Sequence, residues 1–206
     1  MATITSADLI GAFNAIAATM ETNRDALCAL DGEIGDADHG IAMATGFGAV
    51  RTALADLGEG AAPTDVLNTA AKSFLSGVGA SSGPLYATGF MRAGAMAKGK
   101  ESLGDEDMAP LLSAIAEGIA YRGKASLGDK SMLDVWQPAA DAAQSAEAGQ
   151  ALQVAADVAE KSAEATAEMQ AKIGRAARLG ERSIGHKDPG AVSAAMLIRT
   201  LAESLG

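Results

Sequence analysis

The sequence predicts an all-α protein, and three observations point to that class. Hydrophobic residues make up 49% of the chain but aromatic residues only 3%, a composition that favours closely packed helices over a strand-rich core. The apolar residues recur at the three- and four-residue spacing of a helix. No stretch of four or more residues shows the two-residue alternation that a half-buried strand requires.

Eight helical segments account for the apolar pattern. The first begins with Thr5 or Ser6 as its N-cap, and Pro63, Pro84 and Pro189 suit the first turns of three later helices. The expected segments are 5–30, 40–57, from 63, from 84, 105–121, 132–148, 151–172 and from 189.

The apolar stripes of these segments are expected to form the core. They include Leu75 and Met91. Trp136, near the start of its segment, is also expected to be buried in the core. A chain of 206 residues can bury about 70% or more of its unfolded surface as one unit, so we expect a single domain over residues 1–206.

The net charge, the N-terminal sequence and the cysteine count narrow the possible binding partners and the cellular compartment of the protein. A net charge of −10 argues against nucleic acid or an anionic membrane as partner, because both would need a basic face. The N-terminus lacks the basic and apolar regions of a secretory signal, and no apolar run approaches the length of a membrane span. With Cys28 as the single cysteine, we expect a cytoplasmic protein.

Four of the seven connections between these helices carry most of the reactive side chains. In an up-and-down array each helix runs antiparallel to its predecessor, so the connections after the first, third, fifth and seventh helices lie at one end. These connections contain the clustered carboxylates, glycines and serines, both histidines and a group of basic residues; they span 31–40, 77–84, 122–132 and 174–190. We therefore expect a functional site at this rim.

The most informative connection runs from Asp31 to Gly40 and places Asp31, Asp36 and Asp38 within eight residues. Carboxylate pairs at about 4 Å repel by roughly 4 kcal/mol at an effective dielectric near 20, unless a cation lies between them. Mg²⁺ is the first choice, because hard divalent cations prefer oxygen ligands. A calcium EF-hand is excluded, since a count from Asp36 places Phe47 where a glutamate ligand is required. Taken alone, a segment of this kind is more often a solvated acidic loop.

Two other connections suit a phosphate group. Ser81 and Ser82 precede a helix start among glycines, where hydroxyls, backbone N–H groups and the helix dipole can face an anion. Arg175, Arg178 and Arg182 can balance phosphate charge. Each feature alone has an ordinary reading, as a helix cap or a surface arginine. Their combination with hard-metal ligands on one rim indicates phosphoryl transfer from a magnesium–nucleotide complex, without a Walker A or protein-kinase signature.

Motifs spread over essentially the whole chain carry a family resemblance. They are Glu33–Gly40, Ser82–Leu85, Arg122–Ala125, Gly128–Lys130, Asp134–Trp136 and Leu179–Gly190. In order and at similar spacing, they resemble the nucleotide-binding L subunit of bacterial dihydroxyacetone kinase.

The resemblance implies an antiparallel eight-helix barrel that binds ADP or ATP with two Mg²⁺ ions at its mouth. In such a site Asp31, Asp36 and Asp38 would bind the metals, and Arg175 would act in catalysis. The residues that would contact the nucleotide are His39, Gly40, Ile41, Ala42, Ser81, Ser82, Gly123, Met132, Arg175, Asp188, Pro189 and Gly190.

The resemblance also implies partner subunits. Dihydroxyacetone would be held on a separate K subunit. In the phosphotransferase-linked form, bound ADP is rephosphorylated by a phosphohistidine-carrying M subunit, whereas in the other form exchangeable ATP is the donor. The segment Gly35–Gly40 is more similar to the phosphotransferase-linked type.

One departure from the family pattern leaves alternatives open. Family members commonly carry Asn where this chain has Ala42, and Ala44 also replaces a polar residue. The donor type and the ketose therefore stay open, and a four-carbon ketose is one alternative. A nucleotide-binding regulator of a transcription factor is the non-enzyme alternative, and the chain could also form a homodimer.

Overall fold

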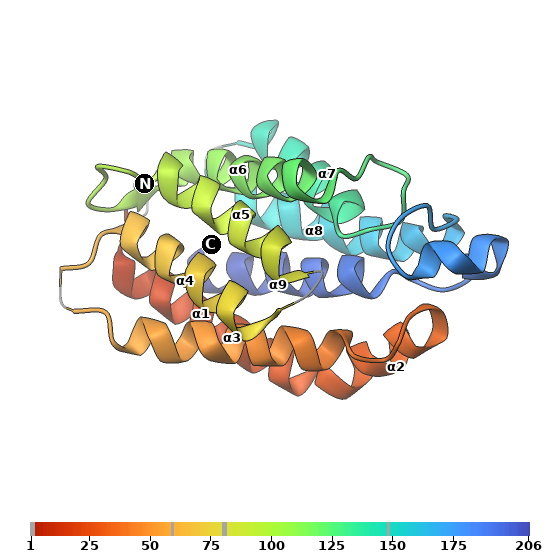
Figure 1. Cartoon of the computed structure of the whole chain (residues 1–206). Helices are drawn as coiled ribbons and strands as arrows, with labels where there is room; N and C mark the ends of the chain where they lie inside the picture. Colours follow the sequence, from red (N-terminus) through yellow and green to blue (C-terminus); the bar gives the residue numbers. More distant parts are fainter. Residues whose placement is uncertain (1–2, 59, 80–81, 148) are drawn as a thin grey trace.

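The computed structural model describes residues 3–58, 60–79, 82–147 and 149–206 (Figure 1). Its helices are α1 (Ser6–Thr22), α2 (Arg24–Ile34), α3 (His39–Ala55), α4 (Pro63–Gly77), α5 (Ser82–Met96), α6 (Asp105–Gly123), α7 (Leu133–Gln144), α8 (Ala151–Ala165), α9 (Pro189–Leu205) and the short 3₁₀ helices η1 (Thr166–Glu168) and η2 (Ala176–Ser183). The all-α class is confirmed. Two strands of two residues each, β1 (Thr3–Ile4) and β2 (Leu103–Gly104), pair antiparallel and were not expected.

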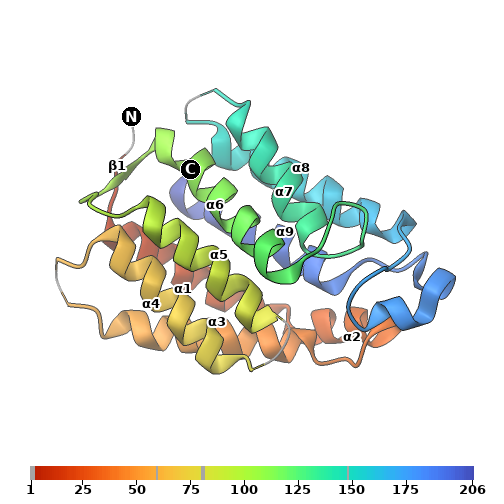
Figure 2. The ribbon, with the colours of Figure 1, turned by 45° about the horizontal axis from the view of Figure 1, so that its top comes forward.

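The long helices form a closed ring. Each of α3 to α8 packs on the next helix along the chain, α9 packs on α1, and α1 packs on α3. Figure 2 shows this arrangement with α2 projecting beyond the others at one end, beside the segment that joins α8 to α9. The ring encloses one continuous core, whose aromatic centre contains Phe47, Phe74, Tyr86, Phe90 and Trp136.

Several helix starts follow directly from the local sequence. Thr5 caps α1 in a capping box: its hydroxyl accepts the N–H of Asp8, and the Asp8 carboxylate accepts the N–H of Thr5. Pro63 and Pro189 occupy the first turns of α4 and α9, where a missing N–H costs nothing.

The first predicted helix is wrong in its extent. The segment 5–30 is broken at Asn23, whose side-chain amide donates to the carbonyl oxygen of Thr19 at 2.9 Å and so competes with the helical hydrogen bonds. The second part, α2, continues to Ile34. Asp31 therefore lies on a helix and not in the connection to which we assigned it.

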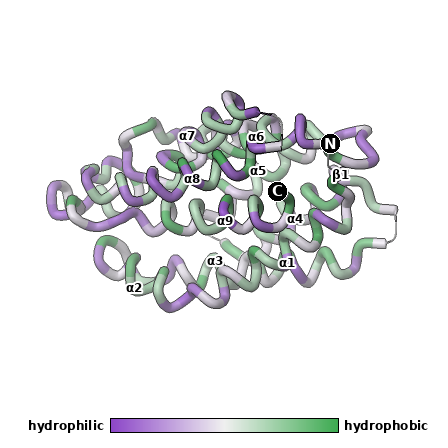
Figure 3. The backbone as a smooth tube through the Cα atoms, turned by 180° about the vertical axis from the view of Figure 1, so that it is seen from behind, coloured by the Kyte–Doolittle hydropathy of each residue, from purple (hydrophilic) through white to green (hydrophobic). Residues whose placement is uncertain are grey.

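The end of the helix predicted over 151–172 is also wrong. The α-helix ends at Ala165, because the Thr166 hydroxyl donates back to Ala163 O at 2.6 Å and accepts the N–H of Asp188 at 3.0 Å. Residues 166–188 thereby become a long connection instead of two further helical turns. Figure 3 shows this connection as a hydrophilic segment at one end of the molecule.

Two stripe residues that we expected in the core lie on the surface. Leu75 is 46% exposed and Met91 is 58% exposed, on the outer sides of α4 and α5. Trp136 is fully buried, as expected. Within the described residues, none of the helices has both the length and the apolar character needed to cross a membrane.

Candidate functional site

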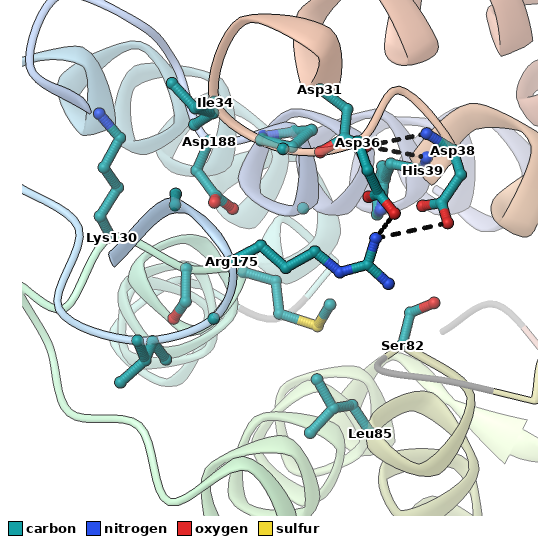
Figure 4. Close-up of a pocket in the computed structure, with 18 residues that line it drawn as sticks. Asp31, Ile34, Asp36, Asp38, His39, Ser82, Leu85, Lys130, Arg175 and Asp188 are labelled. Carbon is teal, nitrogen blue, oxygen red and sulfur yellow. Dashed lines mark hydrogen bonds and ion pairs between the residues drawn. The ribbon is translucent and has the colours of Figure 1, made fainter. Parts of the chain in front are cut away.

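One pocket collects residues from all four connections that we assigned to the rim (Figure 4). Its lining residues are Asp31, Ile34, Gly35, Asp36, Asp38, His39, Ser82, Leu85, Lys130, Ser131, Met132, Ile173, Gly174, Arg175, Ala176, Asp188, Pro189 and Gly190. Ten of the predicted site residues are among them.

Four helices point their N-termini at this pocket. Helices α3, α5 and α9 begin at the lining residues His39, Ser82 and Pro189, and the lining residue Met132 is the N-cap of α7. A helix N-terminus carries about half a positive elementary charge and unpaired N–H groups. The pocket wall therefore offers a concentrated anion-binding potential.

The turn between α2 and α3 brings three carboxylates together. Asp31 is buried, and its Oδ2 accepts the N–H groups of Asp38 at 3.0 Å and of His39 at 3.3 Å. The turn bends sharply because Ala37 has a φ of 62° and because Gly35 lies against Asp31, where a Cβ would overlap the carboxylate. As a result, one oxygen from each of Asp31, Asp36 and Asp38 lies within 4.8 Å of the others.

The donor chemistry of this cluster fits a hard divalent cation. All three groups are carboxylates, which Mg²⁺ prefers, and two of them, Asp36 and Asp38, are about half exposed and so accessible to an ion. In the structure the guanidinium of Arg175 lies against Asp36 and 3.7 Å from Asp38 Oδ2, as Figure 4 shows. The positive group thus lies where a charge-neutralising cation is needed.

His39 connects α3 to α9. Its Nε2 lies 2.8 Å from the hydroxyl of Ser193, and that hydroxyl also lies 3.1 Å from the carbonyl oxygen of Gly190. Burial lowers the pKa of His39, and the nearby Asp31 carboxylate opposes this effect. The histidine is therefore held in a fixed orientation at the start of α3.

Asp188 is the N-cap of α9, and its Oδ2 accepts the N–H of Ala191 at 2.8 Å. Burial raises the pKa of Asp188 to about 7, although the Ala191 N–H favours the ionised form. The neighbouring Asp134 and Asp31 carboxylates add to the increase.

We expect Asp188→Asn to stabilise the protein more at pH 8 than at pH 5. The pKa of Asp188 is about 7 in the folded protein and 3.8 in the unfolded chain. Between these two pH values the folded protein keeps a proton that the unfolded chain has released, so the free energy of unfolding of the wild type falls as the pH rises from about 4 to about 7. The amide introduced by Asp188→Asn does not titrate, and the variant does not lose this stability. Three pKa units correspond to about 4 kcal/mol at most, and because the side chain is only partly buried we expect a difference of about 1–2 kcal/mol between the two pH values.

Thermal unfolding of both proteins in a chelator, without nucleotide, measures this effect. Asn keeps an oxygen for the Ala191 N–H, so the cap itself is preserved. A Tm difference that stays constant from pH 5 to pH 8 would mean that Asp188 ionises at its ordinary pKa in the folded protein.

Two buried charged residues near the pocket were missed as site residues. Lys130 is 2% exposed and Asp134 is 4% exposed, and the Asp134 carboxylate accepts the N–H groups of Gly128 and Ser131. Burial lowers the pKa of Lys130. Both lie within segments that carry the family resemblance, Gly128–Lys130 and Asp134–Trp136, but their spacing alone gives them no role.

Several predicted residues lie outside this pocket. Gly123 lines an adjoining, mainly apolar slot together with Leu85 and Met132. Ile41 is 55% exposed and lines a separate depression, and Ala42 packs partly buried against the core.

Two predicted nucleotide contacts remain, and one of them, Gly40, is absent from the pocket lining that the described residues form. Gly40 is buried at the contact between α3 and α2, where a Cβ would overlap the carbonyl oxygen of Arg24. Ser81 lies outside the described residues.

Comparisons with known proteins agree with the resemblance. The DAK2 domain family matches residues 33–203. The chain is 43% identical over 189 residues to the ADP-binding subunit of a PEP-dependent dihydroxyacetone kinase from Escherichia coli, with 88% of each chain covered. It is 40% identical over 205 residues to the D-erythrulose kinase of Mycolicibacterium smegmatis, covering 93% of this chain but 34% of that longer protein.

A solved structure gives the same result for the fold. The dihydroxyacetone kinase from C. freundii, in complex with AMP-PNP and Mg²⁺, superposes with a TM-score of 0.73 at 26% identity, covering 99% of this chain and 35% of that one. The family match spans most of the chain, and the E. coli relative corresponds to it over nearly the full length of both. This chain therefore belongs to the DAK2 domain family, among the relatives of the ADP-binding subunits of bacterial dihydroxyacetone kinases.

Proposed function

We propose that this chain is the nucleotide-binding, phosphoryl-transferring subunit of a dihydroxyacetone kinase and that it holds ADP or ATP with Mg²⁺ in the pocket of Figure 4. The observation that carries the proposal is that groups of opposite charge line the same pocket. Four helix N-termini attract an anion, whereas the cluster of Asp31, Asp36 and Asp38 repels one. A polyphosphate with bound divalent metal satisfies both sides at once.

The three aspartates would hold the metal, and we propose two ions. Bound Mg²⁺ would supply charge neutralisation on the phosphate oxygens. The N-terminus of α5 at Ser82, which Ser81 precedes in the sequence, and the N–H groups of Gly40 and Ile41 in the first turn of α3 would orient the phosphates. Arg175 is the catalytic residue in this proposal, because its guanidinium already lies beside the acidic cluster and can balance charge on a phosphoryl group in transfer.

The base and ribose would occupy the apolar side of the site. The slot that adjoins the pocket is lined by Leu85, Ile119, Gly123, Met132 and Leu133. An aromatic base gains from such an apolar lining, and the turn at Asp188, Pro189 and Gly190 lies at the edge of the pocket near Met132.

The donor and the acceptor are part of the same proposal. The E. coli relative is named a PEP-dependent kinase subunit and corresponds to this chain over 88% of its length. By analogy, a phosphotransferase-system phosphohistidine on an M subunit would regenerate ATP from bound ADP. Dihydroxyacetone would be presented by a separate K subunit, in the cytoplasm.

The second candidate acceptor is a four-carbon ketose. The D-erythrulose kinase relative is 40% identical over 93% of this chain, and this chain has Ala42 where the family resemblance leads us to expect Asn. An assay of phosphoryl transfer with dihydroxyacetone and with erythrulose, each with its K-type partner, distinguishes the two acceptors.

We expect ADP to remain bound through gel filtration in Mg²⁺ and to be lost in a chelator. The carboxylates, metal and diphosphate neutralise one another, so removal of the metal leaves phosphate oxygens facing carboxylates. Mass spectrometry of the supernatant after denaturation should detect about one ADP per chain in Mg²⁺ and little after chelation, with binding restored when Mg²⁺ and ADP are added back. Absence of nucleotide together with rapid ATP exchange would support an ATP-dependent kinase.

A further inference from the structure

Lys130 occupies an unusual place for a lysine. It is 2% exposed, in the connection between α6 and α7, and its φ of 64° lies in the left-handed region that non-glycine residues avoid. Burial of an ammonium and a strained backbone both oppose folding, so other interactions must hold this residue in place.

Those interactions join the two ends of one loop. The ammonium of Lys130 donates to the carbonyl oxygen of Met169 at 3.0 Å and to the carbonyl oxygen of Ser183. We call residues 169–183 the arginine loop, because Arg175 lies within it. A single buried side chain therefore bonds to both ends of this loop.

Further hydrogen bonds close the base of the arginine loop. The Ser183 hydroxyl accepts the N–H of Ala171 at 2.9 Å and donates to the carbonyl oxygen of Gly180 at 2.6 Å. The N–H of Lys172 donates to the carbonyl oxygen of Asp129, the neighbour of Lys130, at 3.1 Å. The loop, which includes η2, is thus attached to the α6–α7 connection at Asp129 and Lys130.

We infer that Lys130 is a positioning residue that fixes the arginine loop, and through it the guanidinium of Arg175, over the nucleotide pocket. This inference rests on the proposed function for the role of Arg175 but not for the anchoring itself. Figure 4 shows Lys130 at the far end of the pocket from Asp36 and Asp38, so it acts through the loop and not by touching the acidic cluster.

Lys130→Met tests the anchor, because Met has a similar length but no donor for the two carbonyls. Trypsin cleaves after arginine, and the loop contains Arg175, Arg178 and Arg182. In Lys130→Met we expect the initial rate of cleavage at these arginines, followed by mass spectrometry, to rise at least tenfold, with the far-ultraviolet helical signal unchanged.

Lys124→Met is the matched control. Lys124 lies in the same connection and has a similar left-handed φ of 53°, but it is exposed. Its substitution should change the cleavage rate less than twofold. Equal cleavage rates in the two variants would overturn the inference.

A double-mutant cycle tests whether Lys130 acts through Arg175. We expect Lys130→Met and Arg175→Ala each to weaken ADP binding in Mg²⁺ by about tenfold, and the double variant to bind no more weakly than Arg175→Ala alone. If the double variant instead shows the product of the two single losses of ADP affinity, Lys130 acts independently of Arg175, and the inference is contradicted. If Arg175→Ala leaves the affinity unchanged, the proposed role of Arg175 fails, and the cleavage result still decides the anchor.

The wild-type protein provides a second measurement if Lys130→Met does not fold. An amine-acylating reagent should modify Lys130 at least tenfold more slowly than Lys124, and the molecules acylated at Lys130 should be those that trypsin cleaves within the arginine loop. Equal modification rates, or acylation at Lys130 without faster cleavage, would overturn the inference.

Discussion

Replacement of Asp36 by Asn should abolish Mg²⁺-dependent binding of ADP and leave the helical fold intact. The side chain of Asp36 is 46% exposed and lies outside the core, whereas its oxygen lies within 4.8 Å of those of Asp31 and Asp38. Asn removes the charge from a ligand position without changing the shape of the side chain. We expect the affinity for ADP in Mg²⁺ to fall by about a hundredfold or more, because even groups that only support a metal ligand contribute about 10–100-fold.

Titration calorimetry with ADP, in Mg²⁺ and in a chelator, measures this loss. The control is Asp56→Asn, an exposed aspartate at the end of α3, which should bind as the wild type does. The metal-free Tm of Asp36→Asn should be close to that of the wild type, because the removal of one of three mutually repelling charges offsets the loss of the exposed ion pair with Arg175. Wild-type affinity in Asp36→Asn would show that the metal is held elsewhere.

Gly40→Ala should destabilise the whole protein, although the substitution adds one methyl group. A Cβ at this position would overlap the carbonyl oxygen of Arg24 and approach Cys28 Sγ within 2.9 Å, and backbone cannot give way as a flexible side chain can. Overpacking costs about 1–3 kcal/mol and occasionally more. We expect about 3 kcal/mol, which lowers the Tm by about 6–12 °C in a chain of this size.

Gly48→Ala is the matched control, because it makes the same change in the same helix. No heavy atom lies within 4 Å of a Cβ built at Gly48, so the substitution should stabilise the protein by about 0.5–1 kcal/mol through higher helix propensity. Thermal unfolding of both variants tests the pair. Equal Tm values would mean that α3 can move away from α2 at little cost.

The helices could largely be predicted from the sequence, because apolar periodicity and end signals are local properties. Thr5, Pro63 and Pro189 mark helix starts that the structure confirms. The break at Asn23 was missed because an Asn within an apolar pattern breaks a helix only if its amide finds a carbonyl such as that of Thr19. The end of α8 depends on Thr166 bonding to Asp188, more than twenty residues away, which no local pattern contains.

The same division holds for the candidate site. The spacing of Asp31, Asp36 and Asp38 predicted a group of carboxylates, and the structure brings them within 4.8 Å of one another. Lys130 was not singled out, because a lysine in a polar connection is ordinarily solvated, and only the approach of Met169 and Ser183 buries it. The opposite error occurred at Leu75 and Met91. Their helical spacing predicted burial, but both side chains lie on the outer surface of the ring and are exposed.

The sequence alone determined the all-α class, most helix starts, the acidic segment and the family to which the chain belongs. These depend on residues close together in the chain or on motifs in a fixed order. The tertiary structure alone decided that α2 carries Asp31, that four helix N-termini border one pocket and that Lys130 bonds to both ends of the arginine loop. Closure of the helical ring brings these groups together, and the contacts that it creates join residues far apart in sequence, which no local pattern specifies.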